Sequence, residues 1–485
     1  MTERNRLSRR AFLRTVGGMT GAVLLAGCGT TPAPGTGAAA GTTAAAGDAA
    51  AGSTAAAAGG PPPTPVPTPV PDRAAAAGRK TVIEVWYPYP SPNWEAYWKG
   101  FEDSQQDIGI KAVFAANDTT GNAKFFTAVA SGKPPDVAWV DGPQVAEWAA
   151  RGVLEPLDEP IAAAGIKPED FWTPSWNQCV YNDKVYALTL SSDANFGFYW
   201  NKGIFQESGL DPEKPPQTIE EMDQMNEKIA KIEGGRIQRL GFIPWIVYGS
   251  SNSMFTWGWV FGGEFYDPEA KKITADHPNN VKALEWMTAF AKKYDPTQIS
   301  GFIPGLTGPG GETGPFTTRK VAMTPGGPWE IATLKRYAPD LQYGITFMPQ
   351  GPGAEPHQSW VGGWTVGMPK GARNKEAGFE FLKWITTSEG GTNLIYDPNG
   401  NFPGYKKAPV YAKAQQDPVL KPFYDILVET KHQRPVMPAQ AFYAGALARA
   451  VDAAIYGQKT PQQALAEATA ETQKELDRIL KEGVQ

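Results

Sequence analysis

The chain has 485 residues, of which 41% are hydrophobic and 20% are charged, and its formal net charge is −5. These values are typical of a soluble globular protein, and the length exceeds what one hydrophobic core usually serves, so we expect two domains. The charge excludes the broad basic surface with which proteins collect nucleic acid, so we expect no nucleic-acid partner. Two cysteines, Cys28 and Cys179, are too few for a disulfide framework.

The first 27 residues have the features of an export signal. Residues 8–13 (SRRAFL) resemble a twin-arginine signal, and the uncharged stretch 15–27 is shorter than the roughly 20 residues of a membrane-spanning helix. This stretch ends in Leu-Ala-Gly before Cys28, which resembles the lipobox of bacterial lipoproteins. We therefore expect cleavage before Cys28 and lipid attachment to its sulfur, which would anchor the protein to the outer face of the cell membrane.

Residues 28–79 consist almost wholly of alanine, glycine, threonine and proline. They contain too few large apolar side chains to fold, so we expect a disordered tether. Within it, residues 61–71 (PPPTPVPTPVP) predict a stiffer polyproline II segment. Such a tether would hold a domain away from the membrane and still let it reach a membrane partner.

From residue 81 onward, predicted strands and helices alternate along the chain. Strands rich in β-branched and aromatic residues are expected at 81–87, 108–114 and 136–140. Apolar residues at helical spacing predict helices at 94–104, 123–131 and 144–150. This order favours an open parallel sheet with helices on both faces.

A second series of elements follows residue 190. We expect a strand at 196–200, helices at 204–208 and 219–232, a strand at 320–324, and helices at 376–386 and 461–480. Residues 245–316, rich in glycine and aromatic residues, fit no clear assignment. Trp257 and Trp259 would share one face if their stretch were extended; the alternative is that one points inward and the other outward.

Candidate ligand contacts follow from a rule of open α/β sheets, whose ligands bind beyond the carboxyl ends of the strands. Polar and aromatic residues that end the predicted strands meet this condition. The glycine pairs at 326–327 and 362–363 would also let a ligand approach bare backbone. The resulting candidates are Trp86, Tyr89, Asp141, Ser192, Asp193, Asn195, Trp257, Trp259, Trp329, Gly363 and Trp364.

These candidates combine acids, amides and flat aromatic rings, which suits a sugar. Carboxylates and amides pair with hydroxyl groups, while aromatic rings stack on the apolar C–H face of a sugar ring. Plainer roles are open for several of them. Asp141 also suits the N-cap of the helix at 144–150, Asp193 an ordinary turn, and Trp86 and Tyr89 the core.

Several segments match, in order and spacing, the passages of one protein family. They are residues 128–137 (AVASGKPPDV), 152–158 (GVLEPLD), 199–205 (YWNKGIF), and the passages that end in Gly-Pro-Trp329 and Gly-Gly-Trp364. Together they resemble the family 1 extracellular solute-binding proteins of ABC transporters, the sugar-binding group, over residues 81–480. Trp200 stands where that family usually has tyrosine.

This resemblance implies a fold and a function. The expected fold class is α/β, a two-lobed periplasmic-binding-protein-like fold of type II with two open sheets flanked by helices. Hinge crossings near residues 190, 325 and 387 would separate an N-terminal lobe (80–190 plus 326–386) from a C-terminal lobe (191–325 plus 387–485). The implied function is capture of a mono- or oligosaccharide by lobe closure and its delivery to the permease of an ABC importer, by a monomer without cofactor or metal.

Other functional classes were weighed against this interpretation. A lipid-anchored glycoside hydrolase needs two carboxyl groups about 5 to 10 Å apart, for which Asp141, Asp193, Glu264 and Asp267 are available. Nothing in their context marks a general acid, and no Gly-x-Ser-x-Gly motif, phosphate loop or histidine cluster is present, so we expect no enzyme. A binding protein for a non-sugar ligand and a lipoprotein that senses without transport are the further alternatives.

Overall fold

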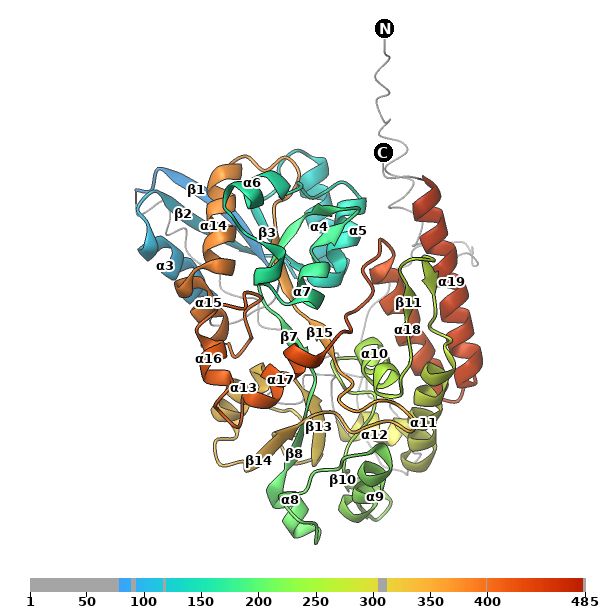
Figure 1. Cartoon of the computed structure of the whole chain (residues 1–485). Helices are drawn as coiled ribbons and strands as arrows, with labels where there is room; N and C mark the ends of the chain where they lie inside the picture. The colour runs from blue at the N-terminus through green and yellow to red at the C-terminus, as the bar shows by residue number, and fades with distance from the viewer. Residues whose placement is uncertain (1–77, 89–92, 117–118, 304–311, 398, 483–485) are drawn as a thin grey trace, which may run out of the picture. The chain divides into compact units, whose positions relative to one another are not determined.

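The computed structural model describes residues 78–88, 93–116, 119–303, 312–397 and 399–482, all within one compact unit of the chain, residues 65–485. Two α/β lobes make up this part of the chain, one above the other in Figure 1. The predicted export signal, Cys28, nearly all of the tether and Tyr89 lie outside the described residues. Among the described helices, none is both long enough and apolar enough to cross a lipid bilayer.

The first lobe is built on a five-stranded sheet with the strand order β2-β1-β3-β16-β6. Its strands are β1 (Thr81–Tyr87), β2 (Ile108–Phe114), β3 (Val137–Asp141), β6 (Ala187–Thr189) and β16 (Trp364–Gly367). β1 runs parallel to β2 and β3, as the alternation of strands and helices predicts. β16 is antiparallel to β3 and β6, because β6 leaves for the second lobe and β16 returns from it.

Helices cover both faces of this sheet, and alternate residues of β1 separate the two faces. Ile83 and Val85 pack against α3 and α14, whereas Trp86 packs against α4 and α5. The helices of this lobe are α3 (Trp94–Ser104), α4 (Thr119–Ala130), α5 (Val145–Ala150), α6 (Asp158–Ala163), α7 (Thr173–Asn177), α14 (Lys375–Thr387) and α15 (Glu389–Tyr396). Short strands β4 (Val180–Tyr181) and β5 (Lys184–Val185) and 3₁₀ turns at Gly142–Gln144 and Pro168–Asp170 complete it.

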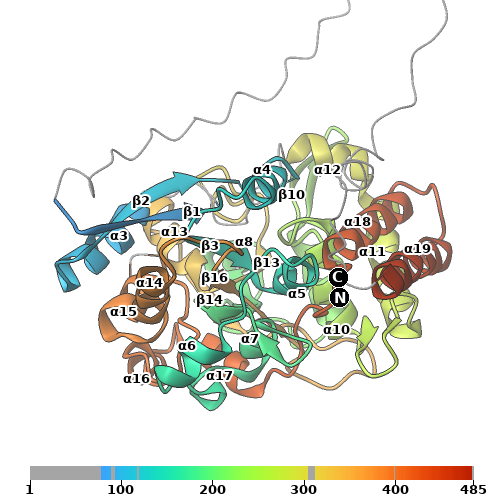
Figure 2. The same cartoon turned by 90° about the horizontal axis from the view of Figure 1, so that it is seen from above.

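The second lobe is mainly helical around a three-stranded antiparallel sheet, β13-β8-β14. Its strands are β8 (Gly197–Asn201), β9 (Lys231–Glu233), β10 (Arg236–Arg239), β11 (Tyr266–Asp267), β12 (Lys272–Ile273), β13 (Met323–Gly326) and β14 (Tyr343–Thr346). Its helices are α8 (Lys202–Glu207), α9 (Ile219–Ile229), α10 (Ser250–Val260), α11 (Pro278–Tyr294), α12 (Pro296–Phe302), α13 (Trp329–Tyr337), α16 (Val410–Ala414), α17 (Lys421–Glu429), α18 (Gln440–Ile455) and α19 (Pro461–Glu482). α18 and α19 lie side by side and pack against α11 (Figure 1, Figure 2).

Three chain crossings form a hinge between the lobes. The first contains β7 (Asp193–Asn195) and the second contains β15 (Trp360–Gly362), and these two strands pair antiparallel. The third crossing, at residues 399–403, is tied to the first by a 2.7 Å hydrogen bond from the Ser192 amide to the Phe402 carbonyl. The hinge is therefore a small hydrogen-bonded unit rather than three separate loops.

The structure corrects the predicted lobe boundaries. The first crossing lies at 190–196, next to its predicted position near residue 190. The other two, predicted near residues 325 and 387, lie at 360–364 and 399–403. β13 and β14 both pair with β8, so the chain beyond residue 325 stays in the second lobe. α15 packs against α3 and α14, so the chain beyond residue 387 stays in the first lobe.

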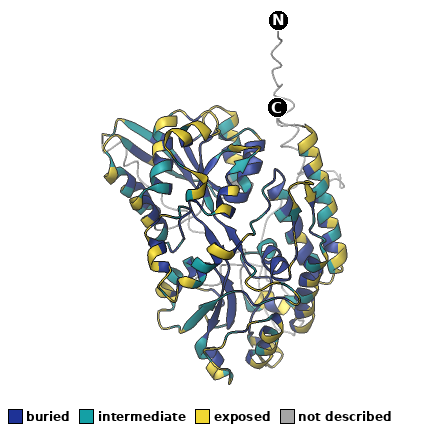
Figure 3. Ribbon diagram, viewed as in Figure 1, coloured by how far each residue is buried: buried dark blue, intermediate teal, exposed yellow. Residues whose placement is uncertain are grey.

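Buried residues are concentrated inside each lobe (Figure 3). In α10 the burial is nearly complete, because every residue from Ser253 to Val260 is buried. Trp257 and Trp259 both lie on this helix, so the extended stretch that would have placed them on one face is not formed. A helix that is apolar on all sides carries no periodic pattern, which is why the sequence did not reveal it.

Candidate ligand-binding site

A cavity of about 670 Å³ opens between the lobes, over the hinge. Aromatic rings in its described wall come from Phe196, Tyr248, Trp329, Tyr337, Trp360 and Trp364. Amide side chains come from Asn93, Asn195, Asn252, Asn399 and Asn401. Charged side chains come from Asp141, Asp193, Arg336 and Arg434. The wall thus offers flat apolar faces together with many hydrogen-bonding groups and few charges.

The floor of the cavity is the hinge itself. β7 supplies Asp193 and Asn195, and the Nδ2 of Asn401, from the third crossing, donates a 3.1 Å hydrogen bond to the Asp193 carboxylate. Gly363 follows β15 with φ +144°, and a Cβ at this position would lie 2.0 Å from the Ser191 carbonyl oxygen. Only glycine fits there, and it leaves bare backbone exposed to the cavity.

The aromatic walls come from both lobes. Trp364 begins β16 of the first lobe, and Trp329 begins α13 of the second. The indole Nε1 of Trp329 donates to the Tyr248 hydroxyl at 2.6 Å, and this hydroxyl donates in turn to the buried carboxylate of Glu330. Tyr248 also stacks on Phe196, with ring centroids 5.3 Å apart. The Trp329 ring is therefore held in one orientation before any ligand binds.

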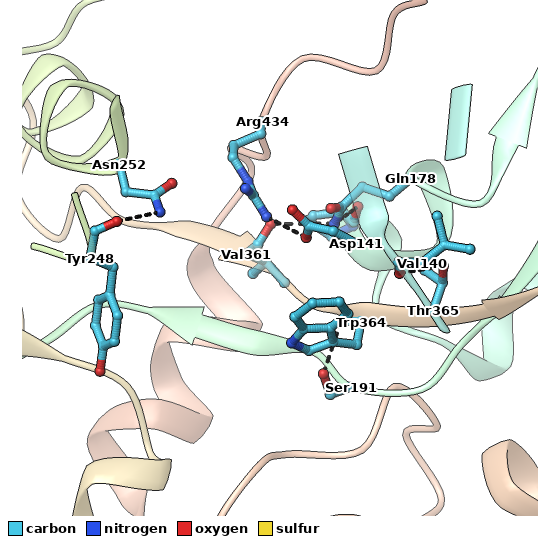
Figure 4. A network of polar contacts seen from close by, with 11 residues as sticks. Val140, Asp141, Gln178, Ser191, Tyr248, Asn252, Val361, Trp364, Thr365 and Arg434 are labelled. Atoms are coloured by element: carbon cyan, nitrogen blue, oxygen red, sulfur yellow. Dashed lines mark hydrogen bonds and ion pairs between the residues drawn. The ribbon is translucent and has the colours of Figure 1, made fainter. Parts of the chain in front are cut away.

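Charged groups meet at one side of the cavity. The Arg434 guanidinium forms a 2.8 Å ion pair with Asp141 at the end of β3 (Figure 4). It also lies 5.3 Å from the centroid of the Trp360 ring. Burial, together with a smaller effect of the negative charge of Asp141, raises the pKa of Asp193 to about 6 against the opposing effects of Asn401, Ser191 and Arg434. The pKa of this carboxyl group therefore lies above its ordinary value.

Residues 96–422 match a protein family described as "Bacterial extracellular solute-binding protein". The chain belongs to this family. The predicted membership among extracellular solute-binding proteins is thereby confirmed, and so is the predicted two-lobed α/β fold. The family and its solved members are binding proteins rather than enzymes.

Relatives of this solute-binding protein cover most of its length. The structure of CpMnBP1 with mannotriose bound is 30% identical, with a TM-score of 0.72 over 81% of this chain and 100% of that chain. A solute-binding protein of Thermotoga lettingae bound with α-D-tagatose has a TM-score of 0.70 over 82% of this chain and 100% of that chain, and at 23% identity it shows the fold alone. The mannitol-binding protein of Pseudomonas aeruginosa is 24% identical over 413 residues, 78% of this chain and 89% of that protein. The sn-glycerol-3-phosphate-binding periplasmic protein of Pectobacterium atrosepticum is 24% identical over 382 residues, 75% of this chain and 84% of that protein.

Six of the predicted contact residues line the cavity of this solute-binding protein: Asp141, Asp193, Asn195, Trp329, Gly363 and Trp364. Asp141 makes no side-chain capping bond to the helical turn that follows it, because its carboxylate pairs with Arg434. The structure therefore replaces the capping alternative for Asp141 with an ion pair. Asp193 is a buried strand residue of the hinge rather than an ordinary turn residue.

Two further candidates, Trp86 and Ser192, lie outside the cavity wall. Trp86 is buried in the first lobe beside Phe125, and its Nε1 donates to the Glu84 carboxylate at 2.7 Å. Ser192 is fully buried and shares a 2.6 Å hydrogen bond with Ser175. Both follow or end a strand, as the sequence indicates, but their side chains point into the lobe.

The two tryptophans of α10 are also core residues. Trp257 is fully buried, and its Nε1 donates to the Pro244 carbonyl at 2.7 Å. Trp259 is buried between Phe255 and His432, with ring centroids 5.5 and 5.4 Å away. Neither lines the cavity, so the expectation of one inward and one outward ring is corrected as well. Glu264 and Asp267, considered for hydrolysis, do not line it either.

Several residues of the wall were not predicted from the sequence, among them Tyr248, Trp360, Asn401 and Arg434. Trp360 carried a usable signal, because it precedes the same glycine pair that led to Trp364. Tyr248 lies in the unassigned stretch 245–316, and Asn401 and Arg434 lie in connections without a predicted element. Only the tertiary packing of the hinge and of the second lobe brings these three to the cavity.

Proposed function

We propose that this protein captures a mono- or oligosaccharide between its lobes and delivers it to the permease of an ABC importer. The composition of the cavity carries this proposal, because aromatic faces from both lobes stand over a hinge floor of carboxylate and amide groups. A sugar offers this wall C–H faces that stack on indole rings and hydroxyl groups that pair with polar side chains.

Each predicted residue at the cavity has a proposed role. Trp329 and Trp364 stack on the sugar from opposite lobes, so that closure places the ligand between them. Asp141, Asp193 and Asn195 pair with its hydroxyl groups; the Asn195 Oδ1 is buried and has no hydrogen-bond partner among the described residues, which a hydroxyl donor would provide.

The relatives support a saccharide as the ligand. CpMnBP1, at 29% and 30% identity, has been solved with mannobiose and with mannotriose bound. Mannitol, the ligand named for one relative at 24% identity, is likewise rich in hydroxyl groups, whereas sn-glycerol 3-phosphate, named for another, is not a saccharide. Mannose oligosaccharides are therefore the first ligands to test on this chain.

Titration calorimetry against mannobiose, mannotriose, maltose and mannitol tests the proposal. We expect saturable binding of at least one saccharide. If none of these sugars binds while polyamines, peptides or sn-glycerol 3-phosphate give a saturable heat of binding, the proposed substrate class is contradicted.

The same samples answer the question of hydrolysis. Asp193, with its raised pKa, lies near Asp141, and a pair of carboxyl groups is what a glycoside hydrolase requires. Chromatography after prolonged incubation with mannotriose is expected to show the intact sugar, because Arg434 already holds Asp141 in an ion pair. Release of mannose would make the protein a hydrolase.

The proposed location is the outer face of the cell membrane, reached through the twin-arginine signal and held by lipid on Cys28. The order of signal, lipobox and low-complexity tether supports it. Cys28→Ser is expected to abolish labelling by radioactive palmitate and to release the protein from membranes. Cys179→Ser is the matched control, because Cys179 is fully buried and burial raises the pKa of its thiol to about 12. A wild-type protein that takes up no radioactive palmitate would contradict lipid attachment at Cys28.

A further inference from the structure

The connection between α17 and α18, residues 430–439, belongs to the second lobe and is termed here the bridging segment. His432 stacks on Trp259 of α10, and its carbonyl accepts a 2.9 Å hydrogen bond from the Val361 amide. Met437 and Ala439 are buried in the core of the second lobe. In Figure 1 this segment rises from α17 toward the first lobe before α18 begins.

The bridging segment and the start of α18 contact the first lobe at three points. The Arg434 Nη2 lies 2.8 Å from the Asp141 carboxylate, and the Asn177 Nδ2 donates to the Gln433 Oε1 at 3.3 Å. In addition, the Ala441 amide donates to the Glu147 carboxylate at 3.2 Å.

Glu147 of the first lobe forms a hydrogen bond with the N-terminus of a helix in the second lobe. It lies on α5 and is 7% exposed, and its carboxylate accepts a hydrogen bond from a backbone amide in the first turn of α18. The first amides of a helix have no intrahelical partner, and the positive end of the helix dipole favours a carboxylate there. One lobe therefore completes the N-terminus of a helix in the other.

These contacts lie outside the hinge. The three crossings at 190–196, 360–364 and 399–403 persist in any arrangement of the lobes, because they are covalent. The Asp141–Arg434 and Glu147–Ala441 contacts join the lobes without a covalent link, so they must break when the lobes separate.

Arg434 connects these contacts to the cavity. Its side chain lines the cavity and lies over Trp360 of the hinge, and its buried Nε has no hydrogen-bond partner among the described residues. An acceptor on a bound ligand would satisfy this Nε while the guanidinium keeps its ion pair with Asp141. The side chain that pairs with Asp141 across the lobes (Figure 4) is thus also the one that a bound ligand would contact.

We propose that Arg434 couples ligand binding to lobe closure, with its ion pair to Asp141 and the Glu147 bond to α18 acting as a clasp that favours the closed arrangement. A ligand that binds Arg434 then stabilises the same state that the clasp stabilises. The response of this clasp to saccharide rests on the proposed function, whereas the existence of the clasp does not.

The test measures the distance between the lobes by pulsed electron paramagnetic resonance. Spin labels are attached at Glu159→Cys in the first lobe and Lys228→Cys in the second, both exposed, in the full chain carrying Cys28→Ser. The buried Cys179 does not take a label. Distances are recorded without ligand and over a titration with mannobiose.

Asp141→Asn, Arg434→Gln and Glu147→Gln are each expected to lower the ratio of closed to open molecules about five- to tenfold, because each removes a charge from a partly buried contact. The double variant Asp141→Arg with Arg434→Asp is expected to recover much of the loss, which a purely structural role would not allow. Asp107→Asn, which removes an exposed ion pair of the first lobe with Lys80, is the matched control and leaves the ratio unchanged.

Two results would overturn the coupling. One is a closed fraction in Asp141→Asn and Arg434→Gln equal to that of the wild type at every mannobiose concentration, zero included. The other is a wild-type chain with no closed population in any sample. If mannobiose has no effect on the wild type, the saccharide proposal is weakened, while the samples without ligand still decide whether the clasp exists.

Discussion

At the residue scale, Trp364 and Trp329 are the side chains that the saccharide proposal depends on most, because they present indole rings to one cavity from different lobes. Trp364→Ala removes one of these faces, and we expect mannobiose to bind about tenfold more weakly or worse. Titration calorimetry measures the change. Trp384→Ala is the control, because Trp384 packs on Phe101 at 5.4 Å inside the first lobe; it should lower stability and leave affinity intact. Equal affinities for Trp364→Ala and the wild type would contradict the stacking role.

Tyr248 is expected to act through Trp329 rather than alone. Tyr248→Phe keeps the stack on Phe196 but removes the hydroxyl that accepts from the Trp329 indole and donates to Glu330. Two buried polar groups then lose a partner, so we expect a loss of about 1–3 kcal/mol in the free energy of unfolding and several-fold weaker saccharide binding. In Tyr443→Phe, a hydroxyl that donates to the Phe265 carbonyl is removed far from the cavity, so only stability should fall. The same affinity in both variants would argue against positioning by Tyr248.

Asp193 is expected to make saccharide binding depend on pH. Its pKa is raised to about 6, chiefly by burial, so the carboxylate that accepts a hydroxyl proton is present above pH 6 and lost below it. We expect affinity for mannobiose at pH 5 about tenfold below that at pH 7.5, and a flat profile in Asp193→Asn.

The same raised pKa predicts the opposite trend for stability. The folded protein holds the proton of Asp193 more tightly than the unfolded chain, whose carboxyl has a pKa near the model value of 3.8. The stabilisation is therefore complete below about pH 4 and is lost as the pH rises through 6. Urea unfolding of the wild type and Asp193→Asn at pH 4.5 and 7.5 checks the sign. The free energy of unfolding of the wild type should fall relative to that of Asp193→Asn as the pH rises, and a relative increase would contradict the assignment.

At the scale of elements, periodic patterns predicted most of the first lobe. β1, α3 and β2 have the bounds that the sequence predicts, because each carries a clear two-residue or helical repeat of apolar side chains. α10 was missed because it is buried all round and has no polar face to mark its period. The antiparallel direction of β16 and the crossings at 360–364 and 399–403 depend on pairing between distant segments, which local sequence does not encode.

Substitution of Gly363 tests whether the hinge depends on the backbone conformation of the second crossing. Its φ of +144° and the 2.0 Å approach of a Cβ to the Ser191 carbonyl leave no room for a side chain. Gly363→Ala should therefore lower the free energy of unfolding by about 2–3 kcal/mol and abolish saccharide binding. Gly301→Ala on α12 meets nothing within 4 Å and should be neutral or stabilising. Thermal unfolding of both variants measures these effects. A Gly363→Ala variant that unfolds at the wild-type temperature would show that the hinge accommodates a side chain at this position.

At the scale of the whole folded unit, the site is divided between two lobes and a hinge, and this division explains which residues were predictable. Asp141 ends a predicted strand and Asp193 follows one, so the rule for open α/β sheets found them, whereas the glycine pair at 362–363 led to Trp364. Arg434 and Tyr248 reach the cavity only through the packing of the second lobe, and no local pattern marks them.

The decisive experiment is a structure of this chain with mannotriose or mannobiose bound. We expect a sugar ring held between Trp329 and Trp364, over Asp193 and Asn195, with Arg434 still paired to Asp141. A saccharide found on the outer surface of either lobe, or a cavity that stays empty at saturating saccharide, would contradict it.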